Sequence, residues 1–316
     1  MARSHRVDYD ADMEEVGLHD GAIIWSDDEV RIRYKKIRKR GVEIWNRLRQ
    51  ALGELRIPVH SLHDVELEPH TKEFRARLTL TPREGACPFH TVAGGTIEHP
   101  DFNPFHFFLN ANEELIVEYY VEELRAGIVR TGLADVPAER PLIQVPHTPK
   151  RLIGGDGRVT LNRDTVTFEF NNQAEPEKIE RRRVWTVPIS SIESVSWEPQ
   201  YSAIDRVPFF QIHLIGAPEG ARIHPFYDIN ALLLYTGPGE ADGLIFAAAL
   251  HERLANNRSQ PAPEPLKTWL GLYHPHSFNQ ADNSLELLKD LASLRAAGII
   301  TEEEFQVKKK QILDRL

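Results

Sequence analysis

The chain repeats itself, and this feature limits its fold more than any other. Residues 19–34 (HDGAIIWSDDEVRIRY) align with residues 155–170 (GDGRVTLNRDTVTFEF). Residues 56–70 (RIPVHSLHDVELEPH) align, in the same order, with residues 186–200 (TVPISSIESVSWEPQ). Ordered self-similarity of this kind indicates a supersecondary unit that occurs more than once. The sequence therefore predicts two copies of one domain.

Each copy reads as several antiparallel strands followed by one helix. Apolar residues alternate on both sides of a polar turn at the start of each copy, which is typical of a hairpin. Further strand-like runs lie at 75–80 in the first copy and at 209–216 and 221–227 in the second. Helical patterns close the copies at 112–127 and 240–255. We expect a bent sheet in each copy, with its apolar inner face covered by the helix.

Apolar residues with the same spacing mark one face of each predicted helix. These positions are Leu115, Ile116, Tyr119 and Tyr120 in the first copy and Leu244, Ile245, Ala248 and Ala249 in the second. Because residues with this spacing share a helical face, we expect that face to lie on the sheet. Replacing Leu115 or Leu244 by alanine is then expected to cost about 2 to 5 kcal/mol.

The matching pieces, "DG...W..D.V.I" and "IP...L..VE.EP", resemble an actinobacterial family described as a domain of unknown function, family 4429. The resemblance covers residues 16–257, and more broadly the pattern is similar to pleckstrin-homology-like (PH-like) domains. It implies a mainly β (α+β) fold: two tandem PH-like bent sheets, each capped by a C-terminal helix. The motifs are structural, so the resemblance implies little about function. The domain boundaries expected from it are 1–15 for an acidic tail, 16–130 and 151–257 for the two copies, and 131–150 for a linker.

The C-terminal segment predicts a linker and an α-helical hairpin. Residues 258–284 are rich in proline and polar residues, and 285–316 show a leucine stripe, a helix stop at Gly298 and a Thr301–Glu304 capping box. The pattern "L..L..AGIIT..EF..KK..IL" resembles the short C-terminal (SHOCT) domain, which implies oligomerisation or docking. A hairpin of this size buries too little surface to fold alone, so we expect it to pack on a second copy, a protein partner or the main body. The candidate oligomerisation residues are Leu287, Leu288, Leu291, Leu294, Ile299, Ile300, Phe305, Ile312 and Leu313.

The composition excludes several classes of protein. A net charge of -9 and a pI near 5.9 do not favour a nucleic-acid binder, which usually carries a basic domain. No apolar run is long enough to span a bilayer, and the N-terminus lacks the apolar core of a secretory signal. Cys87 is the single cysteine, which fits a reducing cytoplasm. We therefore expect a cytoplasmic protein.

One basic stretch, RIRYKKIRKR at 31–40, and a second at 178–183 stand out against this acidic background. Clusters of this kind bind anionic membranes or phosphate groups, and the PH-like resemblance adds to that hypothesis. The alternative is a solvated strand edge, where Lys and Arg prevent aggregation. The candidate anion-binding residues are Lys35, Lys36, Arg38, Lys39, Arg40, Arg181, Arg182 and Arg183.

Candidate catalytic and metal-binding patterns are weak. Cys87 and His90 have C-x-x-H spacing, but His99 and His106 follow too loosely to complete a zinc site. No phosphate-binding loop, nucleophile elbow or zinc-protease motif occurs in the sequence. We therefore predict no catalytic residue, no metal and no cofactor.

The sequence leads to one main hypothesis and two alternatives. The main hypothesis is a non-enzymatic binding or scaffold protein that oligomerises or docks through its C-terminal hairpin. The first alternative is a peripheral protein that binds an anionic membrane or phosphate ligand through its basic stretches. The second is an enzyme without a recognised motif, which would need a deep pocket with convergent polar groups.

Overall fold

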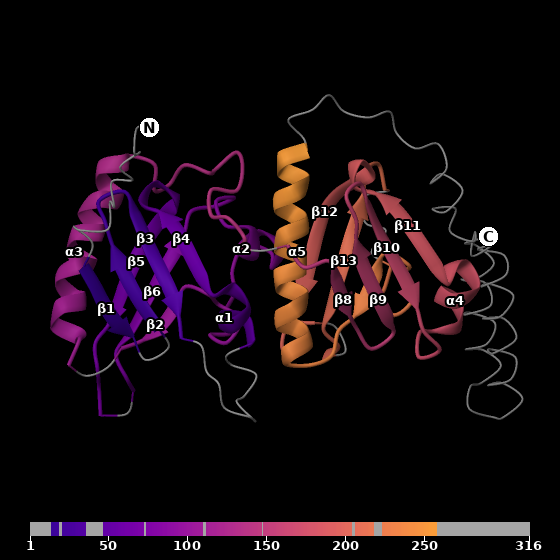
Figure 1. Cartoon of the computed structure of the whole chain (residues 1–316), viewed down its shortest axis with the longest axis horizontal. Coiled ribbons are helices and arrows are strands. Elements are labelled where there is room, and N and C mark those ends of the chain that lie inside the picture. Colours follow the sequence, from indigo (N-terminus) through magenta and orange to yellow (C-terminus); the bar gives the residue numbers. More distant parts are fainter. Residues whose placement is uncertain are drawn as a thin grey trace, which may run out of the picture. The chain divides into compact units, whose positions relative to one another are not determined.

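The computed structural model describes residues 14–18, 21–35, 47–72, 74–109, 112–146, 148–203, 206–217 and 223–257. Within these ranges the chain is mainly β with a few helices, as the sequence predicted (Figure 1). It has four antiparallel sheets, two in each half, where the sequence predicted a single bent sheet in each copy. The predicted linker and hairpin at 258–316 lie outside the described residues.

The first half of the described chain contains two sheets and a closing helix. β1–β4 form one sheet in chain order, and β5, β6 and β7 form the other. The elements are β1 (Glu14–Leu18), β2 (Gly21–Trp25), β3 (Glu29–Tyr34), α1 (Arg47–Leu52), β4 (Glu54–Pro58), the 3-10 turn η2 (Val59–Ser61), β5 (Leu62–Glu68), β6 (Arg77–Pro82), α2 (Pro88–Val92), β7 (His106–Phe108) and α3 (Glu114–Thr131).

The second half places its elements in nearly the same order. β8–β11 form a four-stranded sheet, β12–β14 form a three-stranded sheet, and a long helix follows. The elements are β8 (Arg151–Ile153), β9 (Gly157–Leu161), β10 (Thr165–Phe170), α4 (Pro176–Arg182), β11 (Val184–Pro188), η3 (Ile189–Ser191), β12 (Ile192–Glu198), β13 (Phe209–Leu214), β14 (Ala231–Leu233) and α5 (Pro238–Asn257).

Proline marks the junction between the two sheets of each half. Pro58 ends β4 and Pro188 ends β11, and a single 3-10 turn then leads into the next sheet. Because proline has no N–H to donate, it is suited to a strand end where the ladder stops. The Ser61 hydroxyl donates to the Pro58 carbonyl at 2.6 Å and so fixes the turn.

The strand predicted at 221–227 is wrong. The described part of this segment, from residue 223, turns at Pro225, where the Tyr227 N–H donates to the His224 carbonyl at 2.9 Å. Proline in the second position favours such a turn. The strand that pairs with β13 is the short β14, which lies further along the chain.

The helix α3 covers its own half with a face that the sequence reading did not select. α3 packs against β5 and η2. Its buried positions are Val117, Val121, Leu124, Gly127 and Ile128. Leu115 is 82% exposed, so its prediction as a core residue is wrong. At about 100° per residue, Leu115 lies on the opposite side of the helix from this buried face.

The helix α5 is buried on nearly every side. It packs against β12, β13 and β8 of its own half and against α2 and α1 of the first half, next to which it lies in Figure 1. Leu244 is 0% exposed, as predicted for a core residue. On the exposed rim of this contact, Arg47 donates two hydrogen bonds to Asp242, at 2.9 Å and 3.0 Å.

The segment that follows α3 binds to both halves. The Leu142 N–H donates to the Ala86 carbonyl at 2.9 Å, and the Val145 N–H donates to the Glu252 carboxylate at 3.1 Å. Ile143 is fully buried. The residues expected to form a linker at 131–150 therefore take part in the packing between the halves.

Candidate functional site

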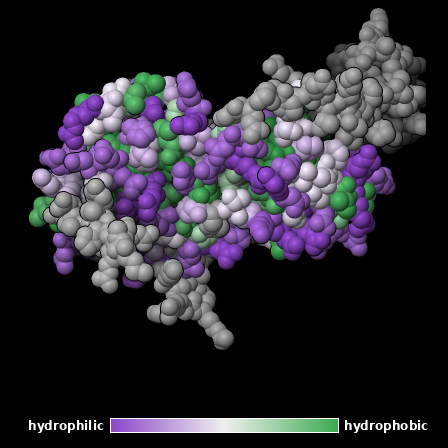
Figure 2. All heavy atoms as spheres, turned by 45° about the horizontal axis from the view of Figure 1, so that its top comes forward, coloured by the Kyte–Doolittle hydropathy of each residue, from purple (hydrophilic) through white to green (hydrophobic). Residues whose placement is uncertain are grey.

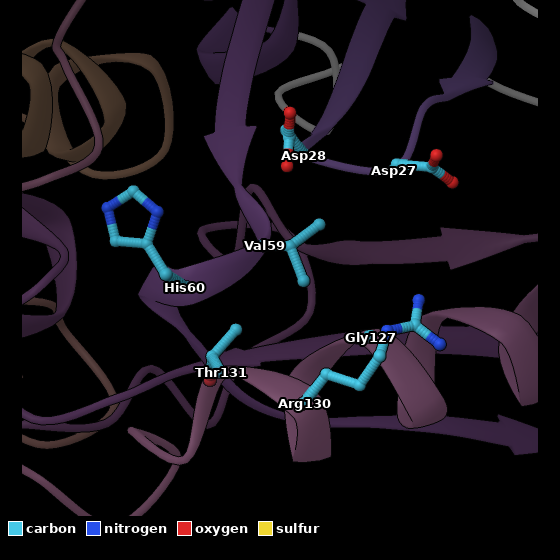
Figure 3. Close-up of a pocket in the computed structure, with 7 residues that line it drawn as sticks. All are labelled: Asp27, Asp28, Val59, His60, Gly127, Arg130 and Thr131. Atoms are coloured by element: carbon cyan, nitrogen blue, oxygen red, sulfur yellow. The ribbon is translucent and has the colours of Figure 1, made fainter.

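A polar pocket of about 430 Å³ opens at the C-terminal end of α3. The β2–β3 turn supplies Asp27 and Asp28, the turn η2 supplies Val59 and His60, and α3 supplies Gly127, Arg130 and Thr131. In Figure 3 the two aspartates lie on one side of the pocket, Arg130 and Thr131 lie on the other, and Val59 lies between them. The pocket thus combines carboxylates, a guanidinium, an imidazole and an apolar floor.

Short-range hydrogen bonds hold the aspartate side of the pocket. The Ser26 N–H donates to the Glu29 carbonyl at 3.0 Å, and the Glu29 N–H donates to the Ser26 hydroxyl at 3.1 Å. This tight turn leaves both aspartate side chains exposed. The Val59 N–H donates to the Asp28 carbonyl at 2.8 Å, which ties η2 to the turn.

The helix side of the pocket depends on a small residue and a helix end. A side chain at Gly127 would approach Val59 Cγ1 at 3.4 Å and Arg130 Nη2 at 3.7 Å. Thr131 closes the helix by donating from its hydroxyl to the Ile128 carbonyl at 2.7 Å, and Gly132 follows with φ 63°. A left-handed glycine is a common helix stop. The sequence reading did not select these residues, because only the fold brings the turn and the helix end together.

A second surface of interest is the side of α3 that faces away from its sheet. We call Leu115, Ile116, Tyr119 and Val129 the outer face of α3. Their exposed fractions are 82%, 46%, 59% and 77%. In the view of Figure 2, hydrophobic residues lie scattered among hydrophilic ones. Because the exposed apolar residues of soluble proteins are usually scattered singly, four of them on one side of a helix indicate a contact surface.

The basic residues predicted to bind anions are only partly described. Lys35 is exposed at the end of β3, and Arg181, Arg182 and Arg183 are exposed at the end of α4. Lys36, Arg38, Lys39 and Arg40 lie outside the described residues. The predicted oligomerisation residues of the hairpin also lie outside them. The described structure therefore tests neither set, and both remain predictions.

The described parts of the two basic stretches lie in the connections between equivalent strands. Lys35 directly follows β3, and Arg181–Arg183 close the helix α4 before β11. The basic residues on β3 also lie near carboxylates: Arg31 is 3.4 Å from Glu29, and Arg33 is 3.3 Å from Glu15.

The lysine of the second basic stretch has a structural role. Lys178 is 0% exposed; its ammonium donates to Asp156 at 2.7 Å and to the Ala231 carbonyl at 3.0 Å. Burial lowers the pKa of Lys178, and the nearby Asp156 carboxylate opposes that shift. In the first half, Arg49 of α1 reaches the His106 carbonyl at 2.6 Å, at the corresponding start of β7. Both buried cations thus connect a short helix to the edge of a sheet.

Cys87 and His90 form no reactive pair. Burial raises the pKa of the Cys87 thiol to about 12 and lowers the pKa of the His90 imidazole to about 4. The thiol therefore stays protonated, and it is the thiolate that acts as nucleophile and metal ligand. Across the described ranges, no three His, Cys, Asp or Glu side chains gather in a group that could hold a metal ion.

Comparison with known families supports two parts of the sequence reading. Residues 25–125 match the model of a domain of unknown function (DUF4429), and residues 286–313 match the short C-terminal domain (SHOCT). The domains named from the sequence motifs are thereby confirmed. The search of curated proteins found no match to this chain.

None of the helices in the described part of the chain has both the length and the apolar character needed to cross a bilayer.

Proposed function

We propose that this chain is a non-enzymatic binding protein of the scaffold type. It has a body of two tandem PH-like domains, and its C-terminal hairpin links it to a second copy. The observation that carries the proposal is the outer face of α3, whose four apolar side chains are exposed. The match of residues 286–313 to the short C-terminal domain supplies a candidate occupant.

The contrast with α5 supports a helical occupant. The fold buries the second side of α5 by placing the short helices α1 and α2 against it. A predicted pair of short helices with a leucine stripe is the same kind of element. Such a hairpin gains stability only by covering an apolar face elsewhere, because it cannot form a sufficient core by itself.

Charge and chain length support a second copy as the source of that hairpin. The exposed glutamates beside the outer face of α3 are Glu118, Glu122 and Glu123, and the hairpin carries a lysine run at 308–310. The predicted linker at 258–284 can extend to roughly 90 Å, so it does not confine the hairpin to its own body. Exchange of hairpins between copies would present two binding bodies together and raise avidity.

Light scattering coupled to size-exclusion chromatography tests this proposal. We expect the full chain to elute as a multimer and the 1–283 truncation as a monomer. Leu115→Glu is expected to lower the mass of the full chain, because a carboxylate would be buried in the contact. Ile153→Glu is the matched control, since Ile153 is 61% exposed on β8, away from α3.

Two results would contradict the proposal. Equal masses for the full chain and the truncation would remove the hairpin as the linking element. A multimer that Leu115→Glu leaves intact would show that the hairpin associates without the outer face of α3.

A further inference from the structure

The two closing helices can be aligned through a hydrogen bond that both make. The Glu114 carboxylate of α3 accepts the His70 N–H at 3.0 Å, and the Glu240 carboxylate of α5 accepts the Gln200 N–H at 2.6 Å. His70 and Gln200 each stand two residues after the equivalent strands β5 and β12. Glu114 therefore corresponds to Glu240.

In this alignment, Gly127 of α3 corresponds to Arg253 of α5. Both residues stand thirteen positions after the aligned glutamate. In the second half, the Arg253 guanidinium donates to the carbonyl of Arg163, in the β9–β10 turn. The corresponding turn residue in the first half is Asp27, which lines the pocket. The pocket in the first half thus lies where the second half holds an arginine side chain of its own.

The surrounding framework is the same in both halves. The Ile189 N–H donates to the Asp164 carbonyl at 2.9 Å, as the Val59 N–H donates to that of Asp28 at 2.8 Å. On the helix, glycine stands in place of Arg253, and Arg130 stands in place of Asn256. The turn gains a carboxylate at the same time, because Asp27 stands where the second half has Arg163.

We propose that the pocket lined by Asp27, Asp28, Gly127 and Thr131 binds the guanidinium of an arginine side chain presented by another polypeptide. The incoming group takes the place that Arg253 occupies in the second half and donates to the Asp27 carbonyl and to the two aspartates. This site does not depend on the C-terminal hairpin, so it can succeed or fail independently of the proposed assembly.

The charges of the pocket favour one arginine over other cations. Asp27 and Asp28 share the pocket with one guanidinium, Arg130, so these three side chains carry a net charge of about -1. A single guanidinium neutralises it, whereas a run of cations meets repulsion from Arg130. The planar guanidinium can also donate several hydrogen bonds in one plane to carboxylate and carbonyl oxygens. The ammonium group of lysine has no such coplanar set of donors.

An NMR titration of the full chain with Nα-acetyl-arginine methylamide tests the ligand class. We expect saturable shifts of the Gly127 and Thr131 amide signals, weaker by at least about threefold for the lysine derivative. The citrulline derivative has nearly the same shape without the charge and is expected to give no saturable shift. Equal responses to arginine and citrulline, or no saturable response to arginine, would overturn the proposal.

A variant whose own side chain fills the pocket gives the most direct test. Gly127→Arg is expected to place an arginine where Arg253 lies in the second half and to weaken binding of the arginine derivative at least about tenfold. Ile153→Arg is the matched control, because Ile153 is exposed on β8 and lies outside both the pocket lining and the outer face of α3. Asp28→Asn serves as a second variant, in case Gly127→Arg unfolds, and is expected to weaken binding about tenfold. Unchanged binding in Asp28→Asn would contradict the proposal.

The same variants identify the source of the arginine. If a second copy supplies it, Gly127→Arg lowers the mass of the full chain in light scattering, and Ile153→Arg does not. If a separate protein supplies it, neither variant changes the mass, and an arginine-containing peptide binds the wild-type chain in preference to Gly127→Arg. Equal peptide binding by the two variants would overturn the assignment of the site.

Discussion

The helices α3 and α5 close corresponding halves of this molecule, yet they have different neighbours. α3 buries one face on β5 and η2 and exposes the other, whereas α5 is covered on both sides by β12, β13, α1 and α2. The aligned residues explain the difference. Glu118 and Glu122 of α3 correspond to Leu244 and Ala248 of α5, so only α5 carries a fully apolar second side. The comparison teaches that the same capping helix can serve either as a core element or as an open surface.

Each half contains a buried cation, and removing the carboxylate partner of Lys178 in the second half should have the largest effect. Asp156→Asn leaves Lys178 buried without its carboxylate and is expected to lower the free energy of unfolding by about 3 to 5 kcal/mol. Urea denaturation measures this loss. Glu169→Gln is the control, because it removes the partner of Arg158 in an exposed pair on the same sheet. A similar loss in both variants would show that burial of Lys178 is not the cause.

The difference between α3 and α5 predicts unequal costs for the same substitution. Leu244→Ala removes a fully buried side chain and is expected to cost about 2 to 5 kcal/mol. Leu115→Ala removes an exposed one and is expected to change stability by no more than about 0.5 kcal/mol. Both are measured by urea denaturation of the 1–283 truncation, so that assembly does not contribute. Equal costs would mean that the outer face of α3 is buried after all.

The first half should respond to pH through His90 of α2, whose ring packs edge-on against Phe105. Burial lowers the pKa of His90 from 6.5 to about 4. The unfolded chain therefore binds a proton that the folded chain does not between these values. The stability that neutral, buried His90 contributes is fully present above about pH 6.5. It is lost as the pH falls toward 4, and the loss is at most about 3 kcal/mol.

Thermal unfolding at several pH values measures this dependence. His90→Gln is expected to flatten it, because the amide does not titrate. An identical pH profile for the wild type and His90→Gln would assign the effect to other groups.

Much of the fold was predictable from local pattern. The alternating strands around the Asp27–Asp28 turn, the prolines at the sheet junctions and the closing helices all follow from short-range preferences. The segment around Pro225 was misread, because a run of apolar residues indicated a strand and the turn preference of proline was given too little weight.

The sequence by itself determined the likeness of the two halves and the match of residues 286–313 to the short C-terminal domain, because these depend on residue spacing along the chain. Only the tertiary structure decided which side of α3 lies on the sheet, why Lys178 is buried, and that the pocket at Gly127 corresponds to the place where Arg253 meets the Arg163 carbonyl. These outcomes depend on which surfaces meet in space. The spacing of apolar residues along a helix does not show whether one side or both sides are covered. The neighbours that cover a helix come from distant parts of the chain.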